Sequence, residues 1–157
     1  MPGDRRFLLE EIFEGLESSV SILQDRRSQR PDFEIDCETD VQDLLYAVMK
    51  PIFPDARPEE YTPKNATDSK RIDFVIPDIS TVIEVKYVRD SSHANSLADE
   101  LKIDIESYHT HENCQRMYCI VWDGNSEIDD VENFENDLTG PRSFDGDEVQ
   151  VETKVLP

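Results

Sequence analysis

Positive charge is scarce in this sequence, and a long apolar run is missing altogether. Lysine and arginine total 16 against 36 aspartate and glutamate residues, which gives the 157-residue chain a net charge of −20. So acidic a surface repels polyanions unless a basic region interrupts it. No apolar stretch approaches the ~20 residues that cross a bilayer, and the basic, interrupted start of the chain lacks the apolar core of a signal peptide. The composition therefore predicts a cytoplasmic protein without membrane contact.

Cysteine and glycine are also few. Their positions do not match a zinc knuckle, a phosphate-binding loop or a nucleophile elbow. The three cysteines, Cys37, Cys114 and Cys119, leave at least one thiol unpaired, and their spacing differs from that of a paired zinc knuckle. The five glycines form neither a phosphate-binding loop nor a nucleophile elbow. At this length we expect one domain with its own core and reduced thiols.

The chemistry of the sequence is concentrated in residues 71–89. β-Branched and aromatic residues fill residues 71–76 and 81–88, and proline, aspartate and serine lie between these two runs, so the pattern predicts a β-hairpin. Side chains two apart on a strand share a face, so Glu84 and Lys86 project together. Ile83, Val85 and Tyr87 then project to the other side.

The first strand of this hairpin contributes a second acid. Its alternation predicts that Asp73 points away from an apolar face made by Ile72, Phe74 and Ile76. If the strands pair, the carboxylates of Asp73 and Glu84 meet on one side of the hairpin. Two carboxylates so close repel each other unless a divalent cation lies between them, and hard oxygen ligands suit Mg²⁺ or Mn²⁺.

Asp73 followed eleven residues later by Glu84-Val85-Lys86 resembles the motif of the PD-(D/E)XK nuclease superfamily, whose members share the restriction-endonuclease-like fold. The order of elements expected in residues 36–123 also resembles that core of a helix, three strands, a helix and a strand. Within the superfamily the chain is most similar to the DpnII/MboI-like and defence-associated nucleases. One departure is that isoleucine, not proline, precedes Asp73.

This resemblance implies an α/β fold, with a small mixed β-sheet flanked by helices. We expect a single domain in which residues 1–35 form an extra N-terminal helix and a linker, residues 36–123 the core and residues 124–157 a C-terminal extension. The implied activity is a metal-dependent endonuclease acting on nucleic acid, with DNA the expected substrate, in restriction or antiviral defence. A homodimer and a partner protein of a defence system fit the same resemblance.

The resemblance also implies roles for particular residues. Asp73, Glu84 and the Val85 carbonyl would hold Mg²⁺ or Mn²⁺, and Lys86 would assist the attacking water. In many relatives an acid on the helix before the hairpin joins the metal site, which makes Glu38 a candidate ligand. An acid at a helix start is also favourable to the helix dipole, so both interpretations of Glu38 stay open.

Two helices flank the hairpin in the sequence and carry accessory candidates. The first spans residues 39–50, where Thr39 and Gln42 have the spacing of a capping box, so Gln42 is either structural or accessory to the site. The second spans residues 96–109, and Asp104 falls within its apolar stripe. Because a buried carboxylate needs a partner, Asp104 is expected either to join the site with Tyr108 or to orient it through a structural bond. Ser96 and Asp99 would cap this helix. Outside this region we expect a helix over residues 4–24, strands over 59–62, 116–122 and 148–155, and a short helix over 131–138.

Charge is distributed unevenly along the chain. Residues 64–89 hold five basic and four acidic residues, a net charge of +1, so the remainder carries −21. The basic residues here, namely Lys64, Lys70, Arg71 and Arg89 in addition to Lys86, are candidates for binding a phosphate backbone. Residues 25–35 contain three arginines, for which a solvated linker is favoured over a phosphate contact.

The acidic surface has two explanations. The sequence also leaves two functions open besides that of a nuclease. A salt-loving organism screens charge repulsion within about 3 Å at molar salt, whereas solubility alone also favours acidic surfaces. A nuclease fold kept as a binding or scaffold module without turnover is one alternative function. An acidic DNA-mimic inhibitor is another, although it leaves unexplained why the charge is neutralised around the motif.

Overall fold

The computed structural model describes residues 2–61, 71–111, 113–144 and 146–157, which form helices and strands in mixed order. Two short 3₁₀ turns, η1 (Arg27–Gln29) and η2 (Pro77–Ile79), join some of them. The elements follow in the order α1 (Pro2–Gln24), α2 (Glu38–Met49), β1 (Arg57–Tyr61), β2 (Arg71–Ile76), β3 (Thr81–Tyr87), α3 (Ser91–Tyr108), β4 (Arg116–Trp122), α4 (Val131–Leu138), β5 (Gly140–Phe144) and β6 (Asp147–Leu156).

The strands make one mixed sheet in the order β1-β2-β3-β4-β6-β5. Strands β1, β2 and β3 pair antiparallel, β3, β4 and β6 pair parallel, and β5 returns antiparallel to β6. The parallel pair β3 and β4 needs a crossover, which α3 provides. The α/β fold with a small mixed sheet flanked by helices, predicted from the sequence, is confirmed.

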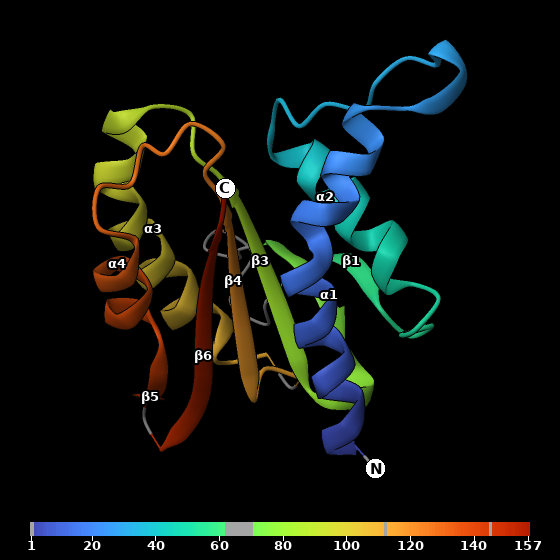
Figure 1. Ribbon diagram of the computed structural model, residues 1–157. Helices are drawn as coiled ribbons and strands as arrows, with labels where there is room; N and C mark the ends of the chain where they lie inside the picture. The colour runs from blue at the N-terminus through green and yellow to red at the C-terminus, as the bar shows by residue number, and fades with distance from the viewer. Residues whose placement is uncertain (1, 62–70, 112, 145) are drawn as a thin grey trace.

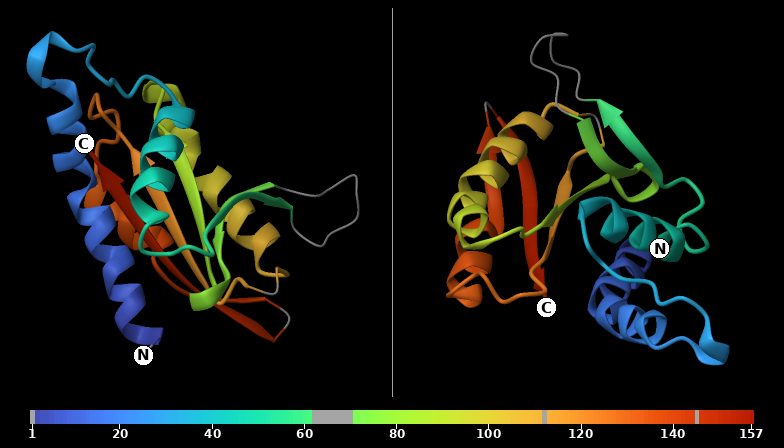
Figure 2. Two further views of the ribbon diagram at one scale, coloured as in Figure 1. Left: turned by 90° about the vertical axis from the view of Figure 1, so that its right-hand side faces the viewer. Right: turned by 90° about the horizontal axis from the view of Figure 1, so that it is seen from above.

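Helices cover both faces of this sheet and enclose two separate cores (Figure 1). Helices α1 and α2 cover one face, and α3 and α4 cover the other, as the view from above shows most clearly (Figure 2). On β3, Ile83 and Val85 pack beneath α1 and α2, whereas Val82 packs beneath α3. Glu84 and Lys86 therefore project toward α3, which is the alternation that the sequence predicted.

The predicted bounds of β4 and α4 agree with the structure to the residue, but α3 begins five residues earlier than expected. Asp90 caps α3, because its side chain accepts a hydrogen bond from the His93 backbone N–H at 2.7 Å. Ser96 lies inside the helix, where its hydroxyl donates to the His93 carbonyl oxygen. The predicted capping box of Ser96 and Asp99 is therefore wrong.

The last fifth of the chain completes the sheet. Strand β6 pairs with β4 over seven residues, so residues 124–157 add two strands to the sheet and a helix to one of its faces. The sequence did not predict β5, which contains Gly140 and Pro141. All three cysteines are free, as expected. Within the described part of the chain, no helix is both long and apolar enough to cross a membrane.

Candidate functional site

The candidate site lies where β2 separates from β3. The ladder between these strands runs from the pair Ile76 and Thr81 to the pair Phe74 and Ile83. Beyond this pair the backbone hydrogen bonds between β2 and β3 end. The Val85 backbone N–H instead donates to the side chain of Asp73, whose Oδ2 accepts it at 2.8 Å. The Asp73 carboxylate is thus held directly beside the strand that carries Glu84 and Lys86.

This separation also corrects one detail of the predicted hairpin. Phe74 and Ile76 pack into the core beneath α1 and α2, but Ile72 packs with Val75 into the core beneath α3 and α4. Simple alternation had predicted that Ile72, Phe74 and Ile76 share one face. In the structure Ile72 lies on the opposite face from Phe74 and Ile76. The strand departs from regular pleating at Asp73, where its backbone leaves the ladder with β3.

Lys86 lies between two buried carboxylates from different elements. Its Nζ lies 3.2 Å from Glu84 Oε1 on the same strand and 3.0 Å from Asp104 Oδ2 on α3. The side chains of Glu84 and Asp104 are each only 6% exposed, and that of Lys86 is 17% exposed. Asp104 thus has a partner in the site itself, since its helical stripe faces β3.

Helices α2 and α3 add two further polar contacts to the carboxylates. Gln42, from α2, makes a side-chain hydrogen bond to Asp73, and Tyr108, from α3, makes one to Glu84. The predicted capping box of Thr39 and Gln42 is wrong, because Cys37 is the N-cap residue and no side chain bonds there. Gln42 is instead directed at the site.

Burial and mutual repulsion raise the proton affinity of the carboxylates. The pKa of Glu84 is raised well above its ordinary value, first by burial and then by the charge of Asp73. Burial also raises the pKa of Asp73, although the Val85 N–H and Lys86 oppose that shift. Glu38 begins α2, and its pKa is raised by desolvation and by Asp73. These three acids and Asp104 outnumber the one lysine among them, so the site favours an added cation.

The donor chemistry of the site fits a hard divalent cation. Glu84 Oε2 is buried and accepts no hydrogen bond from the described residues. That leaves a buried oxygen available beside the Asp73 carboxylate, and carboxylate oxygens suit Mg²⁺ and Mn²⁺. Among the residues that the structure describes, no three histidine, cysteine, aspartate or glutamate side chains stand at the spacing of a metal cluster. A cation here would therefore depend on two carboxylates supplemented by backbone, substrate or water oxygens.

The charge that surrounds Lys86 determines its protonation state. Burial alone would lower the pKa of Lys86, but Glu84 and Asp104 reverse that effect and raise the pKa above its ordinary value. Burial, and next to it Glu84, also raises the pKa of Tyr108. Lys86 is therefore an ammonium and Tyr108 a neutral hydroxyl at neutral pH. Both are donors rather than bases.

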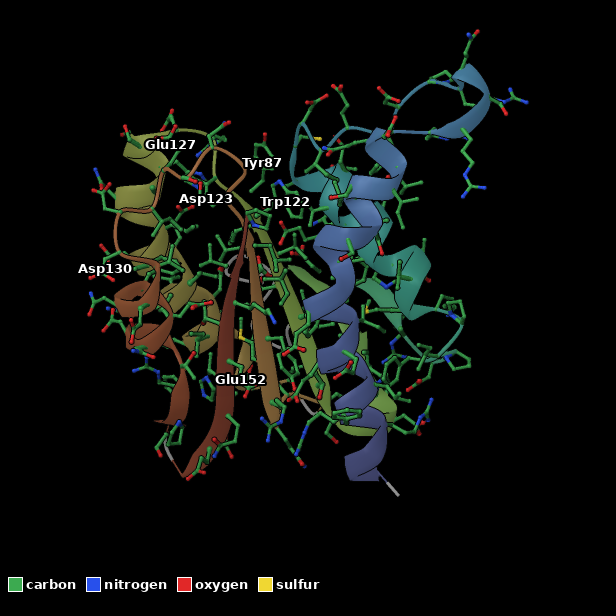
Figure 3. The ribbon with its side chains drawn as sticks, viewed as in Figure 1. Tyr87, Trp122, Asp123, Glu127, Asp130 and Glu152 are labelled. Carbon is green, nitrogen blue, oxygen red and sulfur yellow. The ribbon has the colours of Figure 1, made fainter. Side chains whose placement is uncertain are left out.

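A cavity of about 440 Å³ opens beside Lys86. Tyr87, at the upper end of β3, is one of its lining residues (Figure 3). The cavity lies between the end of β3, the start of α2 and the first half of α3. It is lined by Asp36, Cys37, Glu38, Lys86, Tyr87, Arg89, His93 and Glu100.

His93 was not predicted as a site residue. Its Nδ1 accepts a hydrogen bond from the Arg89 backbone N–H at 3.2 Å, and its Nε2 lies 3.2 Å from Glu100 Oε2. These contacts fix the turn that carries Arg89 into the cavity. No spacing in the sequence indicates this role, because the bond joins a side chain to the backbone of a preceding loop.

The predicted phosphate-binding residues are only partly placed. Arg89 is exposed and lines the cavity, as a phosphate contact would require. Lys64 and Lys70 lie outside the described residues. Arg71 begins β2, and the structure describes only its backbone. The role of these four residues in binding stays a prediction.

Comparison with known proteins gives one match. The model of a restriction-endonuclease family, with the description REase_DpnII-MboI, matches residues 7–157. The match covers the whole described sheet, the helices that the structure describes apart from the first five residues of α1, and every candidate site residue named above. Neither the curated proteins nor the solved structures include a match to this chain.

Proposed function

We propose a metal-dependent cleavage centre for this chain, which belongs to the DpnII/MboI restriction-endonuclease family and is accordingly a DNA endonuclease of the restriction type. The centre is of the PD-(D/E)XK kind, with Asp73, Glu84 and Lys86 as its catalytic residues. One observation carries the proposal: β2 and β3 separate so that Asp73 lies beside the strand on which Glu84 and Lys86 share a face.

Asp73 and Glu84 would hold Mg²⁺ or Mn²⁺, and the Val85 carbonyl is a suitable third oxygen. The N–H and C=O of one strand residue point to the same side, and the Val85 N–H points toward Asp73. Glu38 stands near enough to Asp73 for that charge, after burial, to raise the pKa of Glu38, which makes Glu38 an additional candidate ligand. A cation bound there would polarise the scissile phosphate and lower the pKa of a water molecule.

The chain's own side chains position the reacting groups. Lys86 is held as an ammonium between Glu84 and Asp104, so it orients the attacking water or stabilises negative charge on the phosphate, and it does not accept a proton. Gln42 holds the Asp73 carboxylate from one side of the sheet, and Tyr108 holds Glu84 from the other. These contacts fix two ligands from two strands in one orientation.

A double-stranded substrate leads us to expect a dimer. Each centre hydrolyses one strand, so two copies acting together are the simplest arrangement for cutting duplex DNA. Arg89 is exposed and lines the cavity, which supports a contact with a phosphate next to the cleaved one.

Cleavage of plasmid DNA by the wild type and by two matched variants tests the proposal. Glu84→Gln removes a carboxylate of the centre, and Glu152→Gln makes the same change on β6, far down the sheet from Tyr87 (Figure 3). With Mg²⁺ or Mn²⁺, at low salt and at molar KCl, we expect Glu84→Gln to lower the rate by about 10²-fold or more and Glu152→Gln to leave it unchanged. Cutting that persists in EDTA, or that survives Glu84→Gln, would overturn the proposed centre.

A further inference from the structure

The chain between α1 and α2 forms an arm with an arginine-rich tip, which we define as residues 26–30. The tip has the sequence Arg-Arg-Ser-Gln-Arg and includes η1, and all five residues are exposed. It holds three of the chain's ten arginines and no acidic residue. In a protein of net charge −20, this is a dense local concentration of positive charge.

The tip has a defined backbone conformation. Ser28 and Gln29 both have positive φ, at 61° and 54°, and the Arg30 N–H bonds to the Arg27 carbonyl oxygen. Arg26 donates from Nη1 to the Pro31 carbonyl oxygen at 3.0 Å. The turn therefore presents the remaining two arginine side chains from a fixed position.

Those two side chains, of Arg27 and Arg30, are not used within the described part of the chain. Neither forms an ion pair or a side-chain hydrogen bond there, although Asp25 and Asp32 flank the tip in sequence. By contrast, Arg5 pairs with Asp78. The arm projects away from the body of the molecule (Figure 1). Two exposed guanidinium groups left without carboxylates in so acidic a chain point to an external anion.

The arm lies close enough to the cavity for one DNA duplex to contact both. Glu38, which lines the cavity with Lys86, is eight positions after Arg30 in the sequence. A chain of eight residues spans at most about 29 Å, which is less than the ~34 Å of one turn of B-DNA. The arm and the start of α2 also lie at the same end of the molecule (Figure 2). A duplex seated on the cavity thus has phosphates within reach of the tip.

We propose that Arg27 and Arg30 bind the phosphate backbone of the duplex DNA substrate, within one helical turn of the bond that is cut. The inference rests on the proposed function in taking the cavity as the place of cleavage. The guanidinium group suits this role because its planar fork binds phosphate oxygens in pairs. Such contacts hold the duplex in register without reading its sequence. They also offset the repulsion between DNA and the acidic remainder of the chain.

The test measures binding separately from cleavage. The affinity of a fluorescent duplex of about 30 base pairs is followed over a series of KCl concentrations in EDTA, for the wild type and for Arg27→Gln/Arg30→Gln. Each lost phosphate contact lowers the slope of log affinity against log salt by about 0.9, so we expect the double variant to lower it by about 2 for any duplex sequence. The exposed tip predicts an unchanged melting temperature.

Lys102→Gln/Lys154→Gln is the matched control, since it also removes two positive charges. These lysines pair with Asp137 and Glu14, away from the arm. We expect this control to keep the slope of the wild type. The inference is overturned if the arginine variant keeps the slope, if the control lowers it equally, or if the wild type binds no duplex.

Failure of the inference and failure of the proposed centre are distinguishable. If the arginine variant keeps the slope while Glu84→Gln abolishes cleavage, only the role of the tip is wrong. If the slope depends on the arginines but Glu84→Gln still cleaves DNA, the cleavage centre is wrong and the tip remains a binding site.

Discussion

The Asp73 carboxylate and the Val85 backbone N–H are joined by a hydrogen bond of 2.8 Å at the point where β2 leaves β3. One side chain therefore closes the gap in the sheet and also places a negative charge beside Glu84. The Val85 side chain is buried in the core beneath α1 and α2, so this bond connects the core directly to the candidate centre. Its two roles can be separated by substitution.

Asp73→Asn should separate them. Asparagine keeps a carbonyl oxygen that can accept from Val85, so we expect a change in the free energy of unfolding within about 1 kcal/mol, together with loss of cleavage. Asp73→Leu removes the acceptor and leaves a buried N–H without a partner, which costs about 1–3 kcal/mol. Urea unfolding of the two variants measures the difference. Equal stability of the asparagine and leucine variants would show that the bond does not stabilise the hairpin.

Much of the centre could be predicted from local pattern. The alternation of apolar and charged residues on β3 placed Glu84 and Lys86 on one face, because strand geometry alone dictates which side chains share a face. The helical period likewise placed Asp104 on the buried side of α3. The structure adds the distance of 3.0 Å to Lys86, which no local pattern contains.

The predictions that were wrong or missing concern features that depend on tertiary contacts. Gln42 and Thr39 have capping-box spacing, but α2 begins one residue earlier and Gln42 bonds to Asp73 from another element. Ile72 changes face because the backbone leaves the ladder at Asp73. Strand β5 contains glycine and proline, which disfavour strands, and it forms because β6 offers it an edge.

Gln42→Leu should therefore lower activity more than it lowers the stability of α2. Loss of the amide leaves the Asp73 carboxylate less firmly oriented, and a lost supporting contact of this kind lowers metal affinity or activity by about 10–100-fold. Thr39→Ala is the control on the same helix. Since Thr39 makes no cap hydrogen bond, we expect it to cost well below the ~1 kcal/mol of a true cap. Cleavage assays and thermal unfolding measure both, and a larger activity loss in Thr39→Ala would contradict the assignment.

The stability of the protein in EDTA should fall as pH rises because of Glu84. Its pKa in the folded state lies above that of the unfolded chain, so the folded state binds the extra proton between these two values. The stabilisation is present at low pH and is lost as pH rises through the folded pKa. Asp73 and Glu38 act in the same direction.

Comparison with Glu84→Gln isolates that contribution. As pH is lowered from about pH 8 to about pH 5, we expect the wild type to gain about 1.4 kcal/mol over the variant for each pH unit that lies below the folded pKa of Glu84 and above that of the unfolded chain. Measuring in molar KCl screens the repulsion of the −20 charge, which also changes with pH. Mg²⁺ should shrink the gain if it binds Glu84. Parallel curves for the two proteins would show that Glu84 is ionised at both ends of the range.

Gly15 offers a way to stabilise the chain without touching the centre. It lies in the exposed middle of α1, and beyond its own chain neighbours and the helix backbone a Cβ added there would meet no atom within 4 Å. Alanine in a helix interior is favoured over glycine by about 1 kcal/mol, so Gly15→Ala should raise the melting temperature and leave cleavage unchanged. At Gly124 the same Cβ would stand 3.2 Å from Trp122 Nε1, so Gly124→Ala should give no such gain. Calorimetry of both variants checks the contrast. If Gly15→Ala instead destabilises the protein, its helix face must be covered by something other than solvent, and sedimentation of the wild type would show whether a second copy covers it.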